Sequence, residues 1–245
     1  RLGAVYALVE LADEWLGEVS LPVGVRRGHV QEVIDQLCAY LRSPLNTAAD
    51  NGPAGESAGA QGRIQQAIVE EIHRRVQHPV DSAKGASLAG TWSGFAFNFS
   101  GAVFVCTVNF TGSRWEHEVD FSDCIFMRDA LFSCSAFAGT ANFARSTYRA
   151  LADFSESLYQ DAAYFGGCTW GGAANFSGCT FRAGGYFLGC RYGADTVFTD
   201  CFFASTVVMM YSAYRGAFTA TGCTFAGDAD LSSSAYYGPA SLRGC

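Results

Sequence analysis

Residues 141–162 read ANFARSTYRALADFSESLYQDA, in which a small residue, a spacer and a large apolar residue recur at alternating steps of five and six. The same pattern runs from Phe99 to the end of the sequence and closes every eleven residues. Its second large position, five residues after the first, is aromatic in all thirteen units. A period this regular, carried by Gly, Ser, Thr and aromatic residues, indicates a solenoid of short strands and turns.

The two large positions of each unit are predicted to form a structural core ladder in the solenoid interior. The ladder comprises Phe99, Phe104, Phe110, Trp115, Phe121, Phe126, Phe132, Phe137, Phe143, Tyr148, Phe154, Tyr159, Phe165, Trp170, Phe176, Phe181, Phe187, Tyr192, Phe198 and Phe203. After Phe198 the first position changes to Met209 and then Ala220. We expect this loss of Phe to mark a thinner or capped end.

A small residue stands two positions before each second-position aromatic, and this column holds many of the ten cysteines. Its cysteines are Cys124, Cys168, Cys179, Cys190, Cys201, Cys223 and Cys245. Ser and Ala occupy the same column in other units, so the thiols are predicted to be reduced, buried and small rather than chemically active. Oxidation or metal binding remains the alternative, although no CxxC pair occurs. Reduced thiols favour a reducing, cytoplasmic location.

The triplets Ala141-Asn142-Phe143, Ala152-Asp153-Phe154 and Ala174-Asn175-Phe176 resemble the pentapeptide-repeat family. The resemblance covers about 150 residues and implies a mainly β fold, a right-handed quadrilateral β-helix whose large residues point to the axis. The sequence departs from strict five-residue spacing by one residue per eleven, near residues 105–107, which we expect to form a corner or bulge.

Four faces per coil would place twenty-two residues in each coil and give six to seven coils. At roughly 4.8 Å per stacked strand, the rod would be about 30 Å long. The alternative, an eleven-residue coil, is disfavoured because two large aromatics per turn would overfill its cross-section.

Residues 1–88 are predicted to form a separate α-helical module, followed by the solenoid domain over residues 95–245. Apolar residues at helical spacing predict three helices, over residues 2–16, 30–41 and 60–77. Residues 46–60 are predicted to be a flexible loop and residues 79–94 a junction, which permits the helices either to cap the first coil or to swing. Both ends of the sequence look cut, and we expect the solenoid to be truncated at its C-terminus.

The helical segment is also similar to the region that precedes the repeats in a group of bacterial pentapeptide-repeat proteins. The similar stretches are Leu2-Gly3-Ala4-Val5-Tyr6-Ala7-Leu8 and Leu37-Cys38-Ala39-Tyr40-Leu41-Arg42. This resemblance implies membrane association only through a segment upstream of Arg1, since no apolar run long enough to cross a bilayer occurs in the sequence.

No catalytic, cofactor-binding or metal-binding residues are predicted. The histidines lack the helical i, i+4 pairing of a metal site. Asp120 and Asp153 stand in an outward spacer column that also holds Asn109, Asn142 and Asn175, so we assign them to turn hydrogen bonds rather than to acid–base chemistry.

The formal charge of −7 at pH 7 excludes a basic nucleic-acid surface, and direct nucleic-acid binding is not expected. We expect a non-enzymatic scaffold for an unknown protein partner, with specificity concentrated in the helical module and its junction around Trp92. The resemblance implies an alternative, DNA-mimicking binding to gyrase, which twelve acidic against eight basic residues after Phe95 do not favour. An envelope-associated structural protein with an upstream anchor, and self-association through unpaired strand edges, are further alternatives.

Overall fold

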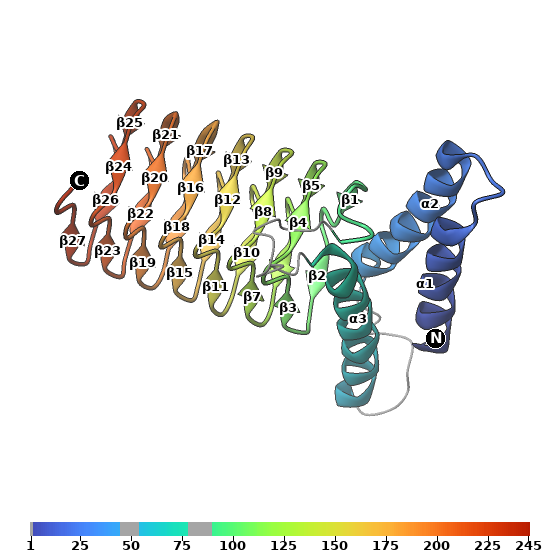
Figure 1. Ribbon diagram of the computed structural model, residues 1–245. Helices are drawn as coiled ribbons and strands as arrows, with labels where there is room; N and C mark the ends of the chain where they lie inside the picture. Colours follow the sequence, from blue (N-terminus) through green and yellow to red (C-terminus); the bar gives the residue numbers. More distant parts are fainter. Residues whose placement is uncertain (1, 45–53, 78–89) are drawn as a thin grey trace.

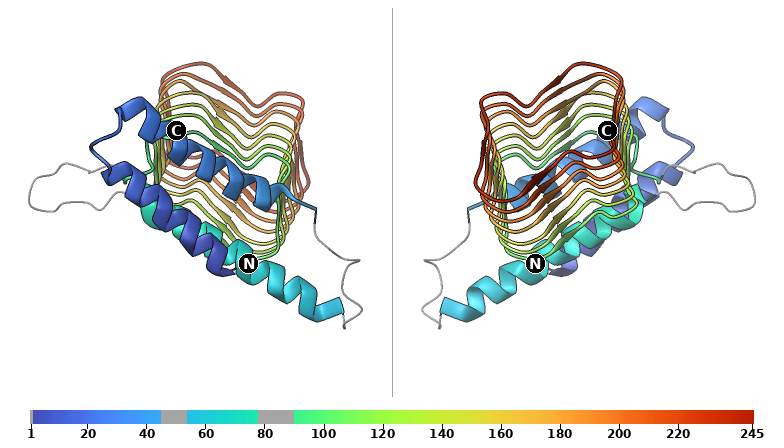
Figure 2. Two further views of the ribbon diagram at one scale, coloured as in Figure 1. Left: turned by 90° about the vertical axis from the view of Figure 1, so that its right-hand side faces the viewer. Right: turned by 90° about the vertical axis from the view of Figure 1, so that its left-hand side faces the viewer.

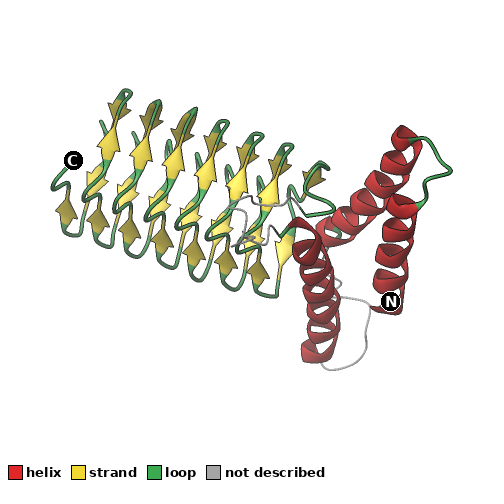
Figure 3. Ribbon diagram, in the orientation of Figure 1, coloured by secondary structure: helices red, strands yellow, loops and turns green. Residues whose placement is uncertain are grey.

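The computed structural model describes residues 2–44, 54–77 and 90–245. Three helices, α1 (Leu2–Gly17), α2 (Val23–Arg42) and α3 (Ala54–Val76), precede a parallel β-solenoid (Figure 1). The helices gather at one end of the rod, and short strands and turns make up the rest (Figure 3). This arrangement confirms the predicted fold class.

The solenoid has four sheets, and every strand pairs in parallel with the strand one coil further on. Phe97 pairs with Val119 and Thr147 with Thr169, so the register advances by twenty-two residues per coil, as predicted. Three sheets contain seven strands and one contains six, which gives about seven coils. The eleven-residue coil is therefore wrong.

Each sheet forms one face of the rod, numbered here in chain order. Face 1 contains β1 (Phe97–Asn98), β5 (Val119–Asp120), β9 (Ala141–Asn142), β13 (Ala163–Tyr164), β17 (Gly184–Tyr186), β21 (Thr206–Val208) and β25 (Ala229–Asp230). Face 2 contains β2 (Val103–Phe104), β6 (Ile125–Phe126), β10 (Thr147–Tyr148), β14 (Thr169–Trp170), β18 (Arg191–Tyr192), β22 (Ala213–Tyr214) and β26 (Ala235–Tyr236).

The other two faces complete the coil. Face 3 contains β3 (Val108–Asn109), β7 (Ala130–Leu131), β11 (Ala152–Asp153), β15 (Ala174–Asn175), β19 (Thr196–Val197), β23 (Phe218–Thr219) and β27 (Ala240–Ser241). Face 4 contains β4 (Arg114–Trp115), β8 (Ala136–Phe137), β12 (Leu158–Tyr159), β16 (Thr180–Phe181), β20 (Phe202–Phe203) and β24 (Thr224–Phe225).

Two kinds of corner alternate along the chain. A tight turn with a positive φ at its third residue follows faces 1 and 3, and these positions recur every eleven residues from Gly101 (φ 76°) to Gly244 (φ 67°). A shorter bend follows faces 2 and 4, and residues 105–107 form the first such bend between β2 and β3. Although this bend is shorter between strands, the step from Phe104 to Phe110 across it is six residues, against five from Phe99 to Phe104. Counted along the core ladder, the extra residue therefore lies at this corner, as predicted. Successive coils superimpose when the rod is seen end-on (Figure 2).

The twenty residues predicted as the core ladder all lie inside the coil, each at most 1% exposed. Rings of successive coils stack face to face: the centroids of Phe121 and Phe143 lie 5.2 Å apart, and those of Tyr148 and Trp170 lie 4.2 Å apart. Rings on facing positions meet edge to face, as Phe143 and Phe154 do at 5.0 Å. Aromatic quadrupoles favour the edge-to-face geometry, whereas the spacing of the parallel stacks follows the strand separation of about 4.8 Å.

In one layer beyond Phe198, another aromatic residue replaces the missing ladder Phe. Ala220 replaces a ladder Phe, but Phe218 occupies the small inward position two residues earlier and is 1% exposed. Its ring contacts Tyr214, with centroids 4.6 Å apart. The large and small residues have exchanged places within β23 and its turn, so the volume of the core layer is conserved.

Helices α2 and α3 cross the open end of the first coil (Figure 2), and α1 packs on their outer side. The Gln31 side chain of α2 pairs with both backbone groups of Ala96, donating to its oxygen at 2.9 Å and accepting from its nitrogen at 3.2 Å. Apolar residues of the helices and of the first coil form one continuous core. The helices therefore cap the coil, and the division into two domains stays a prediction.

The helices differ from the predictions at their ends. Helix α3 begins at Ala54, so the predicted loop over residues 46–60 is wrong from residue 54 onward, and residues 45–53 lie outside the described residues. Most of the predicted junction, residues 78–89, also lies outside them. No helix in the described part of the chain is both long enough and apolar enough to cross a membrane.

Candidate interaction surface

The small-residue column is a ladder of hydrogen bonds between coils. Ser157 Oγ donates to the carbonyl oxygen of Phe132, twenty-five residues earlier, at 2.8 Å, and accepts from the Ser135 nitrogen at 3.1 Å. Cys179 Sγ donates to the Phe154 oxygen in the same way, at 3.0 Å. Ser and Cys alternate in this column because each carries one donor, a role that the interpretation of the thiols as small apolar groups missed.

The column cysteines Cys124, Cys168, Cys179, Cys190, Cys201 and Cys223 are buried, and all ten cysteines are free thiols. Burial raises the pKa of the Cys124 and Cys179 thiols, which keeps them protonated and able to donate. Outside the column, burial raises the pKa of Cys38 to about 12 and that of Cys106 to about 11. Residues 2–44, 54–77 and 90–245 contain no cluster of His, Cys, Asp and Glu suited to a metal ion.

The spacer carboxylates hold turns together. Asp120 Oδ1 accepts from the Ser122 nitrogen at 2.8 Å, and Asp153 Oδ1 accepts from the Ser155 nitrogen at 3.1 Å. Asn142 makes the same contact with the nitrogen of Ala144 at 3.1 Å. Asp and Asn exchange freely in this column because both offer the same side-chain oxygen to the turn.

Trp92 is not a recognition residue, contrary to the expectation for the junction. Its side chain is fully buried under the Arg75 guanidinium, whose carbon lies 5.1 Å from the ring centroid. Arg75 in turn forms ion pairs with Asp13 of α1 and Glu71 of α3, both at 2.6 Å. Trp92 and this network link α1 and α3 to each other and to the start of the solenoid.

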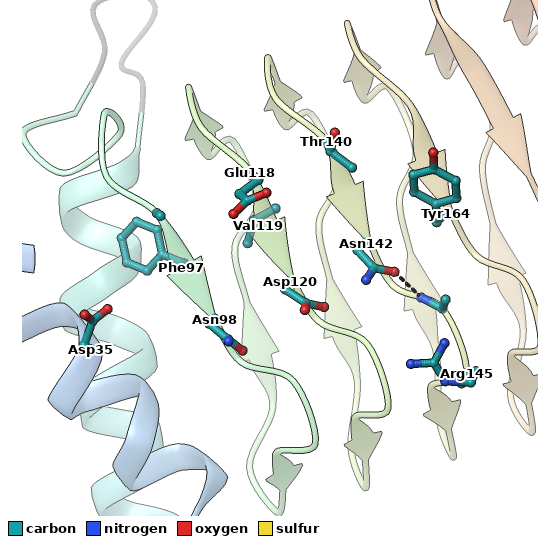
Figure 4. A pocket seen from close by; sticks show the side chains of 12 residues that line it. Asp35, Phe97, Asn98, Glu118, Val119, Asp120, Thr140, Asn142, Arg145 and Tyr164 are labelled. Atoms are coloured by element: carbon teal, nitrogen blue, oxygen red, sulfur yellow. Dashed lines mark hydrogen bonds between the residues drawn. The ribbon is translucent and has the colours of Figure 1, made fainter.

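A groove of about 430 Å³ lies between α2 and face 1 (Figure 4). Asp35 lies on its helical side, and Glu118 and Asp120 lie on β5 and the bend before it. Tyr164, two coils further along face 1, closes the opposite end. The helical cap thus supplies one wall of a groove whose floor is the solenoid sheet.

The groove has more acidic than basic side chains in its lining. Among the ion pairs of the described residues, none includes Asp35, Glu118 or Asp120. Arg145 also lines the groove, but its guanidinium binds Asp123 through two bonds, at 2.7 and 2.6 Å. This pairing holds the pKa of Asp123 below its usual value, while the same guanidinium acts on Asp120 through its charge and not through an ion pair.

Beyond the groove, face 1 becomes aromatic and apolar. Tyr164 and Tyr186 stack on the outside of β13 and β17, with ring centroids 5.1 Å apart and 14° between the ring planes. Leu188 and Tyr211, in the turns that leave face 1, are 45% and 62% exposed. We call the set of Asp35, Glu118, Asp120, Tyr164, Tyr186, Leu188 and Tyr211 the face 1 surface.

The other faces have a different character. Arg149, Arg191 and Arg215 are exposed on face 2 or in the bend that follows it. Asp153 belongs to face 3 and Glu156 to the turn that leaves it. Acidic residues are therefore spread over several faces, and the strongly acidic face required for mimicry of duplex DNA is not formed by the described residues.

The sequence predicted neither the groove nor the face 1 surface. Asp35 and Asp120 belong to different elements, and only docking of α2 on β1 brings them to one groove. The outward tyrosines could have been found, because Tyr164 and Tyr186 occupy the same spacer column twenty-two residues apart. A coil of that length predicts that they stack.

Comparison with known families matches residues 160–201 to the family model described as pentapeptide repeats (9 copies). No curated protein and no solved structure matched the chain. The matched segment runs from the bend before β13 to the turn before β20, and the same strand register continues on both sides of it. The comparison thus identifies pentapeptide repeats in this segment of the β-solenoid.

Proposed function

We propose that this chain is a non-enzymatic scaffold that binds another protein along face 1, while the helical cap forms one wall of the binding surface. The observation that carries the proposal is the gathering of exposed apolar side chains on this face. Tyr164, Leu188 and Tyr211 lie on it or in the turns that leave it. Among the other exposed large apolar residues of the solenoid, Leu151 and Phe202 lie on or beside other faces, and Tyr236, Tyr237 and Leu242 lie in the last coil. Exposed apolar patches commonly mark interaction sites, and repeat proteins commonly use an extended face for binding.

The chemistry of the candidate catalytic residues supports the non-enzymatic part of the proposal. Ser157 and its equivalents bond to backbone carbonyls, and Asp120 and Asp153 hold turns. These hydroxyl and carboxylate groups thus form hydrogen bonds that stabilise the coil. The stacked free thiols Cys179 and Cys201 suit a reducing compartment such as the cytoplasm.

A photo-crosslinking experiment tests the binding face. The residue p-benzoylphenylalanine replaces Tyr164 on face 1 or, as the matched control, Phe202 on face 4, which is 41% exposed. We expect irradiation in native lysate to link a discrete protein to position 164 and not to position 202. The same products from both positions, or none from either, would overturn the proposal.

Two further readouts bear on the alternatives. Crosslinked gyrase subunits, together with inhibition of supercoiling by the purified chain, would replace the scaffold proposal with DNA mimicry. Reproducible turnover of a substrate by the purified chain would overturn the non-enzymatic part.

A further inference from the structure

The face 1 surface changes in chemistry along the rod, and this change restricts what can bind it. At the capped end, Asp35, Glu118 and Asp120 present negative charge without a cationic partner among the described ion pairs. Two coils further on, the exposed Tyr164 stacks on the half-buried Tyr186. A complementary ligand must therefore carry positive charge at one end and an apolar or aromatic group at the other.

We propose that the face 1 surface binds an extended peptide segment of a partner protein that places Lys or Arg in the groove and an aromatic or aliphatic side chain on Tyr164 and Tyr186. This inference rests on the proposed function, because it names the class of partner for the same face. A nucleic acid is disfavoured, since its phosphates would meet the three carboxylates.

The geometry of the solenoid sets the spacing of the recognised residues. Asp120 and Tyr164 are separated by two coils, because Asp120 pairs with Asn142 and the next strand carries Tyr164. At about 4.8 Å per coil this is a span of about 10 Å. An extended peptide advances about 3.3 Å per residue, so the basic and the apolar residue should lie about three residues apart.

Other units of the repeat show which substitutions remove the negative charge of the groove and keep the turn hydrogen bonds. Asp120→Asn keeps the oxygen that accepts from the Ser122 nitrogen, as Asn142 does one coil away. Combined with Glu118→Gln, it removes two charges from the groove. Asp153→Asn is the matched control, because it makes the same change in the same type of turn on face 3.

The aromatic part can be varied in the same manner. Tyr164→Asn introduces the residue found at the preceding position of this column, Asn142, with which Tyr164 pairs. Phe202→Thr is its control on face 4, where Thr180 and Thr224 occupy the neighbouring coils. Circular dichroism verifies that each variant keeps the β-solenoid.

The experiment selects peptides of about nine residues from a displayed random library on the full chain, a length that spans about 30 Å when extended. We expect the selected peptides to carry Lys or Arg about three residues from an aromatic or aliphatic residue. Fluorescence anisotropy with a fluorescein-labelled selected peptide then gives Kd. We expect the groove double variant and Tyr164→Asn each to weaken binding about tenfold, and the two controls less than about twofold.

Selected peptides without basic residues, or a Kd that the groove double variant leaves unchanged, would overturn the inference. So would a library that yields no binder. The crosslinking experiment separates this failure from failure of the proposed function. A partner crosslinked at position 164 through a segment without basic residues leaves the scaffold proposal standing and removes the peptide chemistry, whereas failure of both experiments removes both.

Discussion

The side-chain amide of Gln65 pairs with the backbone around β2 as a neighbouring strand would. Its Nε2 donates to the Val103 oxygen at 2.9 Å, and its Oε1 accepts from the Val105 nitrogen at 3.0 Å. The first coil has no preceding coil to satisfy these groups, and an unpaired strand edge is prone to association. Gln65 of α3 therefore caps the edge of the first coil by pairing with its backbone. Gln31 of α2 does the same at Ala96.

Replacing Gln65 with Met, an apolar residue of similar length, leaves the Val103 oxygen and the Val105 nitrogen without their partner. Each buried backbone group left unsatisfied costs about 1–3 kcal/mol. We therefore expect Gln65→Met to lower the free energy of unfolding by about 2–4 kcal/mol and to speed amide exchange in the first coil before the later coils. Denaturant unfolding and hydrogen-exchange mass spectrometry measure both effects. Uniformly faster exchange over all coils would contradict the capping role.

Truncation of the core ladder should be costly in the middle of the rod. Phe154 is fully buried between the stacked rings of Phe132 and Phe176, with centroids 5.1 Å away on each side. We expect Phe154→Ala to lower the free energy of unfolding by about 3–5 kcal/mol. The exposed Arg149 is the control, and its change to Ala should cost less than about 0.5 kcal/mol. Similar small losses at both positions in urea unfolding would show that the inside and outside of the coil are reversed.

The hydrogen-bond ladder predicts that Ser157 tolerates Cys better than Ala. Ser157→Ala removes the donor to the Phe132 oxygen and the acceptor for the Ser135 nitrogen, at a cost of about 1–3 kcal/mol. Ser157→Cys retains the donor, as Cys179 does one coil later. We expect its loss of thermal stability to be less than half that of the Ala variant. Equal losses would mean that the column selects for size alone.

A Gly→Ala substitution should lower the stability of the protein in a solenoid turn and raise it in a helix. A methyl group at Gly189 or at Gly28 meets no atom within 4 Å, so backbone conformation decides the outcome. Gly189 has φ +68°, which costs an L-residue about 1–2 kcal/mol, and Gly189→Ala should destabilise the protein by about 1 kcal/mol. Gly28 lies within α2, where Ala is favoured by about 1 kcal/mol, so Gly28→Ala should stabilise it. Chemical denaturation measures both, and changes of the same sign would contradict the prediction.

Thiol reactivity should follow burial. The thiolate is the reactive form, and burial raises the pKa of Cys124 and Cys179. Cys134 is exposed. We expect iodoacetamide to alkylate Cys134 in the native protein, and Cys124 and Cys179 only after unfolding, as read from peptide masses. Rapid native alkylation of Cys179 would show that the column is open to solvent.

Some features of the candidate surface were predictable and others were not. The columns of the repeat assign Asp120 and Tyr164 to outward positions, because strand residues alternate and the period is fixed. The sequence does not show that Asp35 of α2 faces them across a groove, since the contact depends on how the helices dock. The burial of Trp92 was unpredictable for the same reason, since a junction position does not reveal that Arg75 of α3 covers its ring.

The sequence alone determined the solenoid, its eleven-residue period and its buried aromatic ladder, because a repeat folds through the same local choices in every unit. The four faces and the twenty-two-residue coil were implied by the resemblance to pentapeptide repeats. The tertiary structure alone decided what interrupts the repeat. Gln31 and Gln65 cap the first coil. Phe218 fills the core volume that Ala220 leaves empty, and α2 forms one wall of the groove on face 1. Each of these features depends on contacts between residues far apart in the chain or on the free volume of one core layer, and a periodic pattern carries no information about either.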